Sequence, residues 1–186
     1  MKQNHSFEYI ILALFLIAFG IIARVLPHPA NVAPIAALAL FAGIYLPKRL
    51  ALILPMAAMF ISDFFVGFYN WKIMLAVYAS FILIGCIGLL IQKNKNFFTI
   101  ATGALSGSIL FFLITNAAVW AFSAMYAKTF SGLLESYRMA LPFFRNTLFG
   151  DIAYSALFIG GFEAIRWALQ MIRMNRFQKV ERGQTP

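Results

Sequence analysis

Six long apolar segments make up most of this chain, and they limit its possible folds more than any other feature. Charged residues are 11% of the sequence and hydrophobic residues 62%, whereas a soluble domain has about 25% charged residues. A helix needs about 20 apolar residues to cross a bilayer, so we predict an all-α integral membrane protein. The six expected spans are Phe7–Leu26, Val32–Leu46, Arg49–Phe68, Trp71–Ile91, Phe97–Tyr126 and Thr147–Met171.

The length of the chain predicts a single domain. At 186 residues it matches the usual size of one domain. We therefore expect residues 1–186 to form one integral membrane domain, with an ordered core over 7–171 and a basic tail over 172–186. Val32–Leu46 is short for a span, which indicates a tilted or partly re-entrant helix. The first span is not expected to be a cleaved signal peptide, because Arg24 and Pro27 occupy the cleavage region.

Lysine and arginine are distributed unequally between the connections. The pairs Lys48-Arg49 and Lys93 with Lys95 lie in two short loops on one side, together with the basic C-terminal tail. Cytoplasmic loops carry the excess of Lys and Arg, so we predict that both termini are cytoplasmic. The expected location is the bacterial inner membrane, as a multi-pass protein. The net charge of +9 is then explained by topology and by contact with membrane lipid, with no nucleic acid as partner.

The longest outer connection, Lys128–Asn146, carries apolar residues at helical spacing. It predicts a short amphipathic helix on the outer face of the membrane, separate from the last span and ended by Pro142. The apolar positions are Phe130, Leu133, Leu134, Tyr137 and Leu141.

Asp63 lies inside the apolar run from Leu50 to Phe68. An ionisable group at membrane depth is costly and usually marks a functional site. Counting from Lys48 at 1.5 Å per residue places Asp63 about 22 Å from the cytoplasmic end, in the outer third of the span. The structural alternative is an ion pair, with Arg145 or Arg24 as the partner, that only holds helices together.

Polar and aromatic residues from several other segments are expected at the same depth. Each has a structural alternative, such as a turn, a hydrogen bond between helices or a contact with lipid headgroups. Their common depth favours one pocket that opens outward. The expected substrate-binding residues are His28, Asp63, Tyr78, Asn116, Trp120, Arg145 and Asp151.

The side chains of this expected pocket suit a polar organic molecule with a large apolar body. They do not suit a bare metal ion, which needs clustered carboxylate, His or Cys ligands. The sequence has no P-loop, HExxH, GxSxG or CxxC motif. We therefore expect no catalytic residues, no metal site, no resident cofactor and no enzyme activity. Cys86 lies in the inner third of its span and is expected to be a packing residue, and Glu163 is expected to pair locally with Arg166.

Four stretches of the sequence resemble one family of transport proteins. They are RVLPHPANVAPIAALALFAG from Arg24, SDFFVGFYNW from Ser62, TNAAVW from Thr115 and LPFFRNTLFGD from Leu141. The family is related to the substrate-binding S-components of energy-coupling-factor (ECF) vitamin transporters, and residues 24–163 are most similar to the solitary BtuM-like cobalamin transporters. The resemblance implies a six-helix S-component fold with both termini inside and an outward-facing pocket.

The resemblance also implies roles for particular residues. It places His28, Asp63, Tyr78 and Arg145 at a vitamin-like ligand, with a corrinoid among the candidates as cargo rather than as cofactor. Some BtuM-like proteins have a cobalt-binding Cys near the position of Ile73, so binding through a thiolate is not expected here.

The first span bears on whether an ECF energising module is a partner. S-components that dock on such a module often carry an AxxxA face on this helix. The small residues of this span are never four positions apart, which favours a solitary protein. They are Ala13, Ala18, Gly20 and Ala23.

The leading hypothesis is therefore an inner-membrane protein that binds a small, vitamin-like molecule in an outward pocket and takes it up. One alternative is a structural or assembly membrane protein without a ligand, whose polar groups pair with each other. Another is a membrane-embedded enzyme in which Asp63 and His28 act as acid and base.

Overall fold

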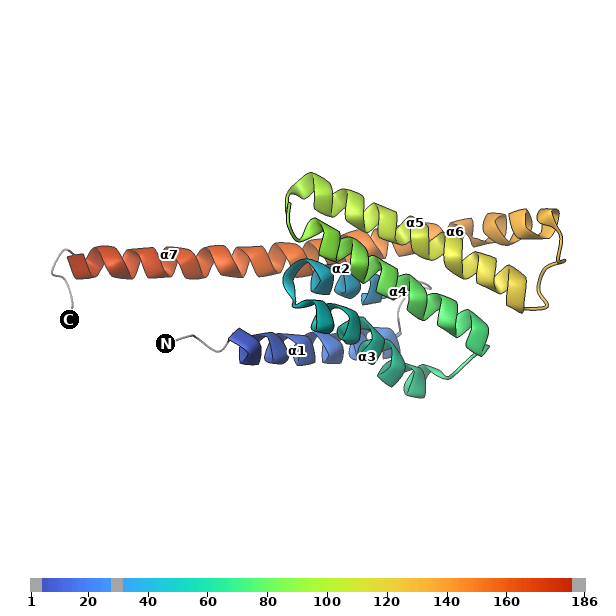
Figure 1. The fold of residues 1–186 in the computed structure, drawn as a ribbon, viewed down its shortest axis with the longest axis horizontal. Helices are drawn as coiled ribbons and strands as arrows, with labels where there is room; N and C mark the ends of the chain where they lie inside the picture. Colours follow the sequence, from blue (N-terminus) through green and yellow to red (C-terminus); the bar gives the residue numbers. More distant parts are fainter. Residues whose placement is uncertain (1–4, 28–31, 182–186) are drawn as a thin grey trace.

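The computed structural model describes residues 5–27 and 32–181, and all regular structure in these ranges is helical (Figure 1). The prediction of an all-α protein is therefore confirmed. The elements are α1 His5–Val25, α2 Ile35–Tyr45, α3 Lys48–Val66, α4 Trp71–Ile91, α5 Phe97–Phe122, α6 Phe130–Ser155, the π-helical segment η1 Ala156–Gly160, and α7 Gly161–Glu181.

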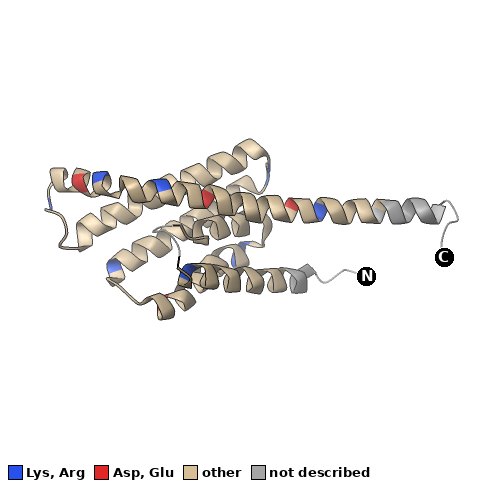
Figure 2. Cartoon of the chain, turned by 180° about the vertical axis from the view of Figure 1, so that it is seen from behind, with Lys and Arg blue, Asp and Glu red and all other residues tan. Residues whose placement is uncertain are grey.

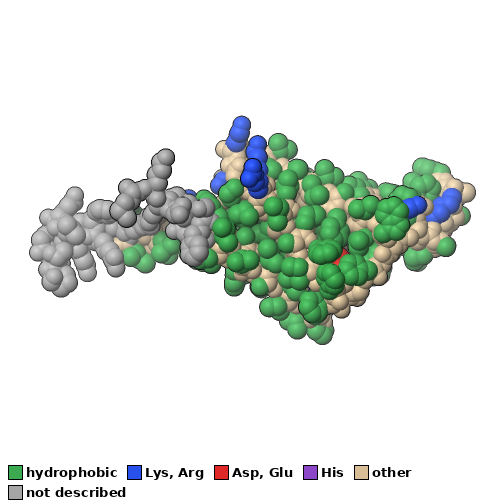
Figure 3. Space-filling model, turned by 60° about the horizontal axis from the view of Figure 1, so that its bottom comes forward, with side chains coloured by type: hydrophobic (Ala, Val, Ile, Leu, Met, Phe, Trp, Pro, Cys, Tyr) green, Lys and Arg blue, Asp and Glu red, His purple; other side chains and the backbone are tan. Residues whose placement is uncertain are grey.

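Within residues 5–27 and 32–181, four helices are long and apolar enough to cross a membrane. They are α3, α4, α5 and the continuous helical stretch Phe130–Ile172, while Tyr9–Val25 and Ile35–Tyr45 are shorter apolar helices. Large hydrophobic side chains are exposed over much of the surface (Figure 3), with Phe97 at 86% and Leu90 at 80%. Soluble monomers rarely expose apolar patches of this extent. The lengths and surfaces of these helices support the predicted membrane bundle.

Helix α2 forms the centre of the bundle. All eleven of its residues are buried, and at 1.5 Å per residue it is about 16 Å long, too short to cross the hydrocarbon core alone. It packs so closely on α4 that the contact leaves no room for a side chain at Gly43. A Cβ on Gly43 would lie 2.3 Å from the Gly85 carbonyl oxygen and 2.7 Å from the Gly88 Cα. The short segment predicted from the sequence is thus a central helix enclosed by α3, α4, α5 and α6.

The predicted outer amphipathic helix is not a separate element, and this prediction was wrong. Pro142 lies inside α6, and α6, η1 and α7 form one helical stretch from Phe130 to Glu181. A proline removes one backbone hydrogen bond, but neighbouring helices can compensate for it within a membrane protein, and α5 packs along α6. The stretch Phe130–Ile172 has 43 residues, about 64 Å of helix, so it extends beyond a hydrocarbon core of about 30 Å.

The beginning of α1 and the end of α7 lie at the same end of the molecule, with α7 projecting beyond the other helices (Figure 1). The α2–α3 and α4–α5 connections lie at this end too, with the pair Lys48-Arg49 at the start of α3 and the pair Lys93 with Lys95 in the α4–α5 connection. Charged residues are few along the helices (Figure 2). Helix α7 also continues through most of the segment expected to be a basic tail, as far as Glu181.

Candidate functional site

Asp63 is neutralised by Arg24, which lies near the end of α1. The Arg24 Nη1 is 2.6 Å from the Asp63 Oδ1, and the Asp63 side chain is completely buried while that of Arg24 is 15% exposed. The Tyr78 hydroxyl donates to the other carboxylate oxygen at 2.7 Å. One carboxylate therefore joins α1, α3 and α4, and the pair adds no net charge to the membrane interior.

The same guanidinium is held by the backbone and a side chain of α3. Arg24 Nη1 donates to the Ser62 Oγ at 2.5 Å and to the Met59 carbonyl oxygen at 3.3 Å. Ser62 is itself fully buried and donates to the Ala58 carbonyl at 2.7 Å. These described contacts all use one nitrogen, and a guanidinium offers five N–H donors. Arg24 can therefore hold Asp63 and bind a ligand at the same time.

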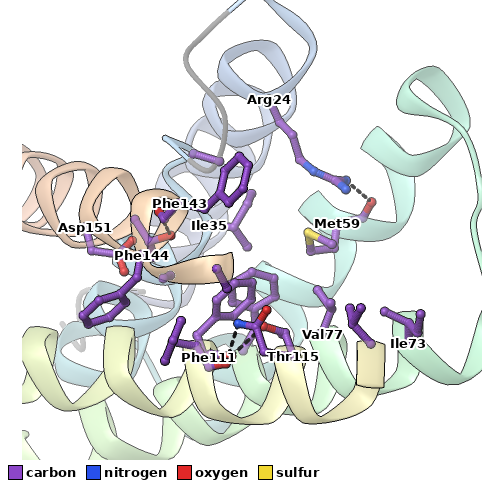
Figure 4. Close-up of a pocket in the computed structure, with 18 of the residues that line it drawn as sticks. Arg24, Ile35, Met59, Ile73, Val77, Phe111, Thr115, Phe143, Phe144 and Asp151 are labelled. Atoms are coloured by element: carbon purple, nitrogen blue, oxygen red, sulfur yellow. Dashed lines mark hydrogen bonds between the residues drawn. The ribbon is translucent and has the colours of Figure 1, made fainter. Parts of the chain in front are cut away.

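A cavity of about 440 Å³ lies beside this ion pair, between the walls formed by α1–α6 (Figure 4). Its walls are largely apolar, and the Phe81 and Phe111 rings on its α4–α5 side stack with centroids 5.2 Å apart. Figure 4 shows Arg24 reaching toward Met59 on α3, with Asp151 and Ile73 at opposite ends of the cavity. A cavity of this size and lining is typical of a site for a small organic molecule.

The polar groups of the cavity are few and well separated. Asn116 donates to the Phe112 carbonyl oxygen at 2.8 Å, which leaves its amide oxygen able to accept from a ligand. The pKa of the Tyr69 phenol is raised above its ordinary value, mainly by burial and also by the nearby Asp63 carboxylate. Arg24 has a smaller, opposite effect on this pKa. Tyr69 therefore presents a neutral hydroxyl. The polar lining residues are Arg24, Tyr69, Thr115, Asn116, Thr147 and Asp151.

Asp151 is the second buried carboxyl group near the cavity, after Asp63. It is 4% exposed, lines the cavity from α6, and accepts a hydrogen bond from the Ser108 Oγ of α5 at 2.6 Å. Within the described residues, the side-chain ion pairs are Arg24 with Asp63 and Arg166 with Glu163. Asp151 thus lacks the cationic partner that Asp63 has.

The structure brings only some of the predicted site residues to the cavity. Asn116 and Asp151 line it, whereas Asp63 and Tyr78 lie behind Arg24 in the ion-pair network. Arg145 is exposed and is not among the lining residues. Of the two alternative partners named for Asp63, Arg24 holds the carboxylate and Arg145 does not.

Two further predicted residues lie elsewhere. The Trp120 indole N–H donates to the Ala127 carbonyl oxygen at 2.9 Å, so Trp120 fastens the α5–α6 connection and does not line the cavity. His28 lies outside the described residues.

Sequence reasoning missed the most central residue. Arg24 was considered only as a possible partner of Asp63, yet it also lines the cavity. Its position at the end of an apolar helix, just before the sequence Pro27-His28-Pro29, was the available signal. Ser108 was not among the expected site residues, and nothing in the local pattern indicated that its hydroxyl reaches Asp151.

The polar cluster at the other end of the bundle is separate from the cavity. Arg166 Nη1 is 3.4 Å from the Glu163 Oε1, which confirms the predicted local pair. The Tyr45 hydroxyl also donates to this oxygen at 2.6 Å, and Lys95 Nζ lies 4.6 Å from the centroid of the Tyr45 ring. Among the described residues no group of three or more His, Cys, Asp or Glu could hold a metal ion.

One protein-family model matches the chain over residues 3–173, which is nearly its whole length. The chain belongs to DUF6580, a family of unknown function. The matched region includes every helix that lines the cavity as well as the Asp63 ion pair. Comparison with curated proteins and with solved structures found no match.

Proposed function

We propose that this DUF6580 protein binds a small, vitamin-like organic molecule in the cavity and takes it up across the bacterial inner membrane. The observation that carries the proposal is the cavity of about 440 Å³ with aromatic walls and a few separated polar groups. The sequence resemblance to S-components of ECF transporters points to the same function. The proposed topology has both termini in the cytoplasm, because the basic loops and the helix ends lie at one end of the bundle.

The volume and the lining narrow the class of ligand. Cavities of about 300–1,000 Å³ hold ligands of drug size, and this one is near the lower limit. It therefore favours a molecule with one or two flat rings over a whole corrinoid, which the resemblance left as a candidate. The Phe111 and Phe81 rings would contact the flat face of the ligand, and Arg24 would bind a carboxylate or carbonyl group at its edge.

The proposed uptake mechanism is alternating exposure of this cavity by a solitary protein. Arg24 is placed to link binding to helix movement, because it lines the cavity and also ties α1 to α3 through Asp63. A ligand carboxylate on the remaining N–H groups of Arg24 would share the guanidinium with Asp63 and so weaken the ion pair. Loosening this pair would release α1 from α3, which is the kind of rearrangement that alternating access needs.

The structural alternative has one observation in its favour. Asp63, Tyr78 and Arg24 satisfy each other within the protein, as expected of polar groups that only hold helices together. Under that alternative the cavity would hold no specific molecule. Filling the cavity would then change nothing that can be measured except stability.

The experiment is mass spectrometry of small molecules that co-purify with the full chain and with the variant Ala140→Trp. Ala140 lines the cavity from α6, so an indole there would occupy the space for the ligand. We expect one or a few compounds that co-purify with the wild type and are reduced at least tenfold in the variant. A tenfold loss corresponds to about 1.4 kcal/mol of binding free energy.

Ala164→Trp is the matched control, because Ala164 is exposed on α7 and does not line the cavity. It should retain the same compounds as the wild type. Equal recovery of every compound from wild type, Ala140→Trp and Ala164→Trp would contradict the proposal and favour the structural alternative.

A further inference from the structure

The α6 residue Asp151 lies between two cavities. It lines the large cavity of about 440 Å³ and also a second cavity of about 10 Å³. The small cavity is lined by Ser155, which lies one helical turn after Asp151 on α6, and by Ser108, which faces it from α5. A volume of about 10 Å³ is close to that of a single water-sized probe. The carboxyl group is thus at the junction of a ligand-sized space and a water-sized one.

The Ser155 hydroxyl has no hydrogen-bond partner among the described residues. Ser155 is 5% exposed, and it lines the small cavity together with Asp151. Buried hydroxyl groups are normally hydrogen-bonded, and an orphaned one needs an explanation. A single water molecule or ion between Ser155 and Asp151 would give this hydroxyl the missing hydrogen-bond partner.

The charge of Asp151 is also unbalanced. A carboxylate in an apolar interior needs a cation or a proton, because burying the bare charge costs far more than neutralising it. The one described hydrogen bond to Asp151 comes from the neutral Ser108. Asp63, by contrast, has a guanidinium at 2.6 Å.

The elements packed against Asp151 offer few other charges. Helix α5 and η1 contain no titratable residue, and the single one of α2 is Tyr45, which is bound to Glu163. On α6 itself, Arg145 is exposed and Tyr154 is half-buried. Across the cavity, Arg24 is engaged with Asp63 and Tyr69 is a neutral phenol.

We propose that Asp151, with Ser108 and Ser155, is a proton-binding site at the end of the ligand cavity. The carboxyl group takes up a proton as a neutral acid and releases it through a water held between Asp151 and Ser155. If the cavity carries a transported molecule, as proposed above, proton binding at Asp151 supplies a means of coupling uptake to the proton gradient. The proton site itself does not depend on the identity of that molecule.

The number of oxygen ligands favours a proton over a metal cation. Asp151, Ser108 and Ser155 supply at most four side-chain oxygens, and the other residues of the small cavity are apolar or glycine. Hard cations such as Ca²⁺ and Mg²⁺ need about six or more oxygens around them. A proton needs one carboxyl oxygen and one acceptor.

The test is infrared spectroscopy of the purified full chain, which detects the C=O stretch of a protonated carboxyl group. We expect a band at neutral pH in the wild type that is absent from Asp151→Asn and that disappears as the pH is raised. The band should shift on transfer to heavy water, because the proton exchanges with solvent.

Two serine variants separate a proton site from general disturbance of the bundle. Ser155→Ala should keep the band but shift its frequency and its pH midpoint, because the nearby hydroxyl is lost. Ser80→Ala is the matched control, since Ser80 is fully buried and bonds to its own helix at the Ala76 carbonyl. It should leave the band unchanged.

Three results would overturn the proposal. The first is identical spectra for wild type and for folded Asp151→Asn at neutral pH. The second is a band that does not exchange in heavy water, which would indicate a permanently protonated structural residue. The third is loss of the band when sodium replaces potassium in the buffer, which would indicate a sodium site. A failure to find co-purifying molecules would contradict the proposed function but would not affect this test.

Discussion

At the scale of single residues, the buried Asp63 carboxylate is balanced by a specific cationic partner. Arg24 and Asp63 lie 2.6 Å apart, and the carboxylate is inaccessible to solvent. Breaking a buried ion pair by removing one partner costs about 3–5 kcal/mol, because the other charge is left uncompensated. Arg24→Leu should therefore lower the thermal stability of the detergent-solubilised protein strongly, and Arg24→Leu with Asp63→Asn should recover part of the loss.

Arg145→Gln is the control for this prediction. Arg145 is exposed and does not contact the Asp63 network, so its replacement should change stability by less than about 0.5 kcal/mol. A loss for Arg145→Gln as large as that for Arg24→Leu would show that the ion pair described here is not the one that stabilises the bundle.

Tyr78 has a smaller role in the same network. Its hydroxyl donates to the Asp63 Oδ2 at 2.7 Å, and a hydrogen bond to a charged group is worth about 1.5–3 kcal/mol. Tyr78→Phe should destabilise the protein by about that amount while preserving the ring packing. Unchanged melting of Tyr78→Phe would mean that water or another donor replaces the phenol.

At the scale of the helices, the packing of α2 on α4 depends on glycines that face each other. A Cβ on Gly88 would lie 2.5 Å from the Leu40 carbonyl oxygen and 2.8 Å from the Gly43 Cα. Backbone atoms cannot move aside as a flexible side chain can, and overpacking typically costs about 1–3 kcal/mol. Gly88→Ala should therefore reduce thermal stability measurably.

Gly161→Ala is the matched control for Gly88→Ala. A Cβ on Gly161 would meet no atom within 4 Å, and replacing a helical glycine by alanine generally stabilises by about 0.5–1 kcal/mol. If both alanine variants melt at the wild-type temperature, α2 and α4 are not packed as closely as described.

Element types were predictable from the sequence to a large extent, whereas helix ends were not. Apolar length predicted α3 and α4 to within a residue or two, because an apolar run between basic or polar residues leaves few choices in a membrane. Pro142 was interpreted as a helix end, yet α6 continues through it. Its effect is decided by the helices packed around it, and the local sequence does not contain that information.

The candidate site was predictable in outline for a similar reason. Depth counting predicted that Asp63, Asn116 and Asp151 lie in one layer, since rise per residue is fixed in a helix. Asn116 and Asp151 line the cavity, which lies beside the Asp63 ion pair. Depth does not fix direction around the helix. Arg145 is therefore exposed although its depth is similar, while Arg24 and Ser108 reach polar partners that depth alone did not identify.

At the scale of the whole molecule, the two ends of the bundle differ in charge. Helix α1 begins and α7 ends at the same end, where the α2–α3 and α4–α5 connections also lie. Lys48 directly follows the first of these connections, and Lys93 and Lys95 lie in the second. Since basic loops are retained in the cytoplasm, the cavity, which lies toward the α5–α6 connection, should be nearer the outer face.

Cysteine labelling in intact cells tests this orientation directly. The background is Cys86→Ala, which removes the single native thiol. Ser131, at the start of α6, is exposed and lies on the expected outer side. Asn94, in the α4–α5 connection, is exposed and lies on the expected cytoplasmic side. A membrane-impermeant maleimide added outside should modify Ser131→Cys and should modify Asn94→Cys only after the cells are opened. The reverse pattern would place the cavity toward the cytoplasm, and uptake from outside would then no longer follow from its position.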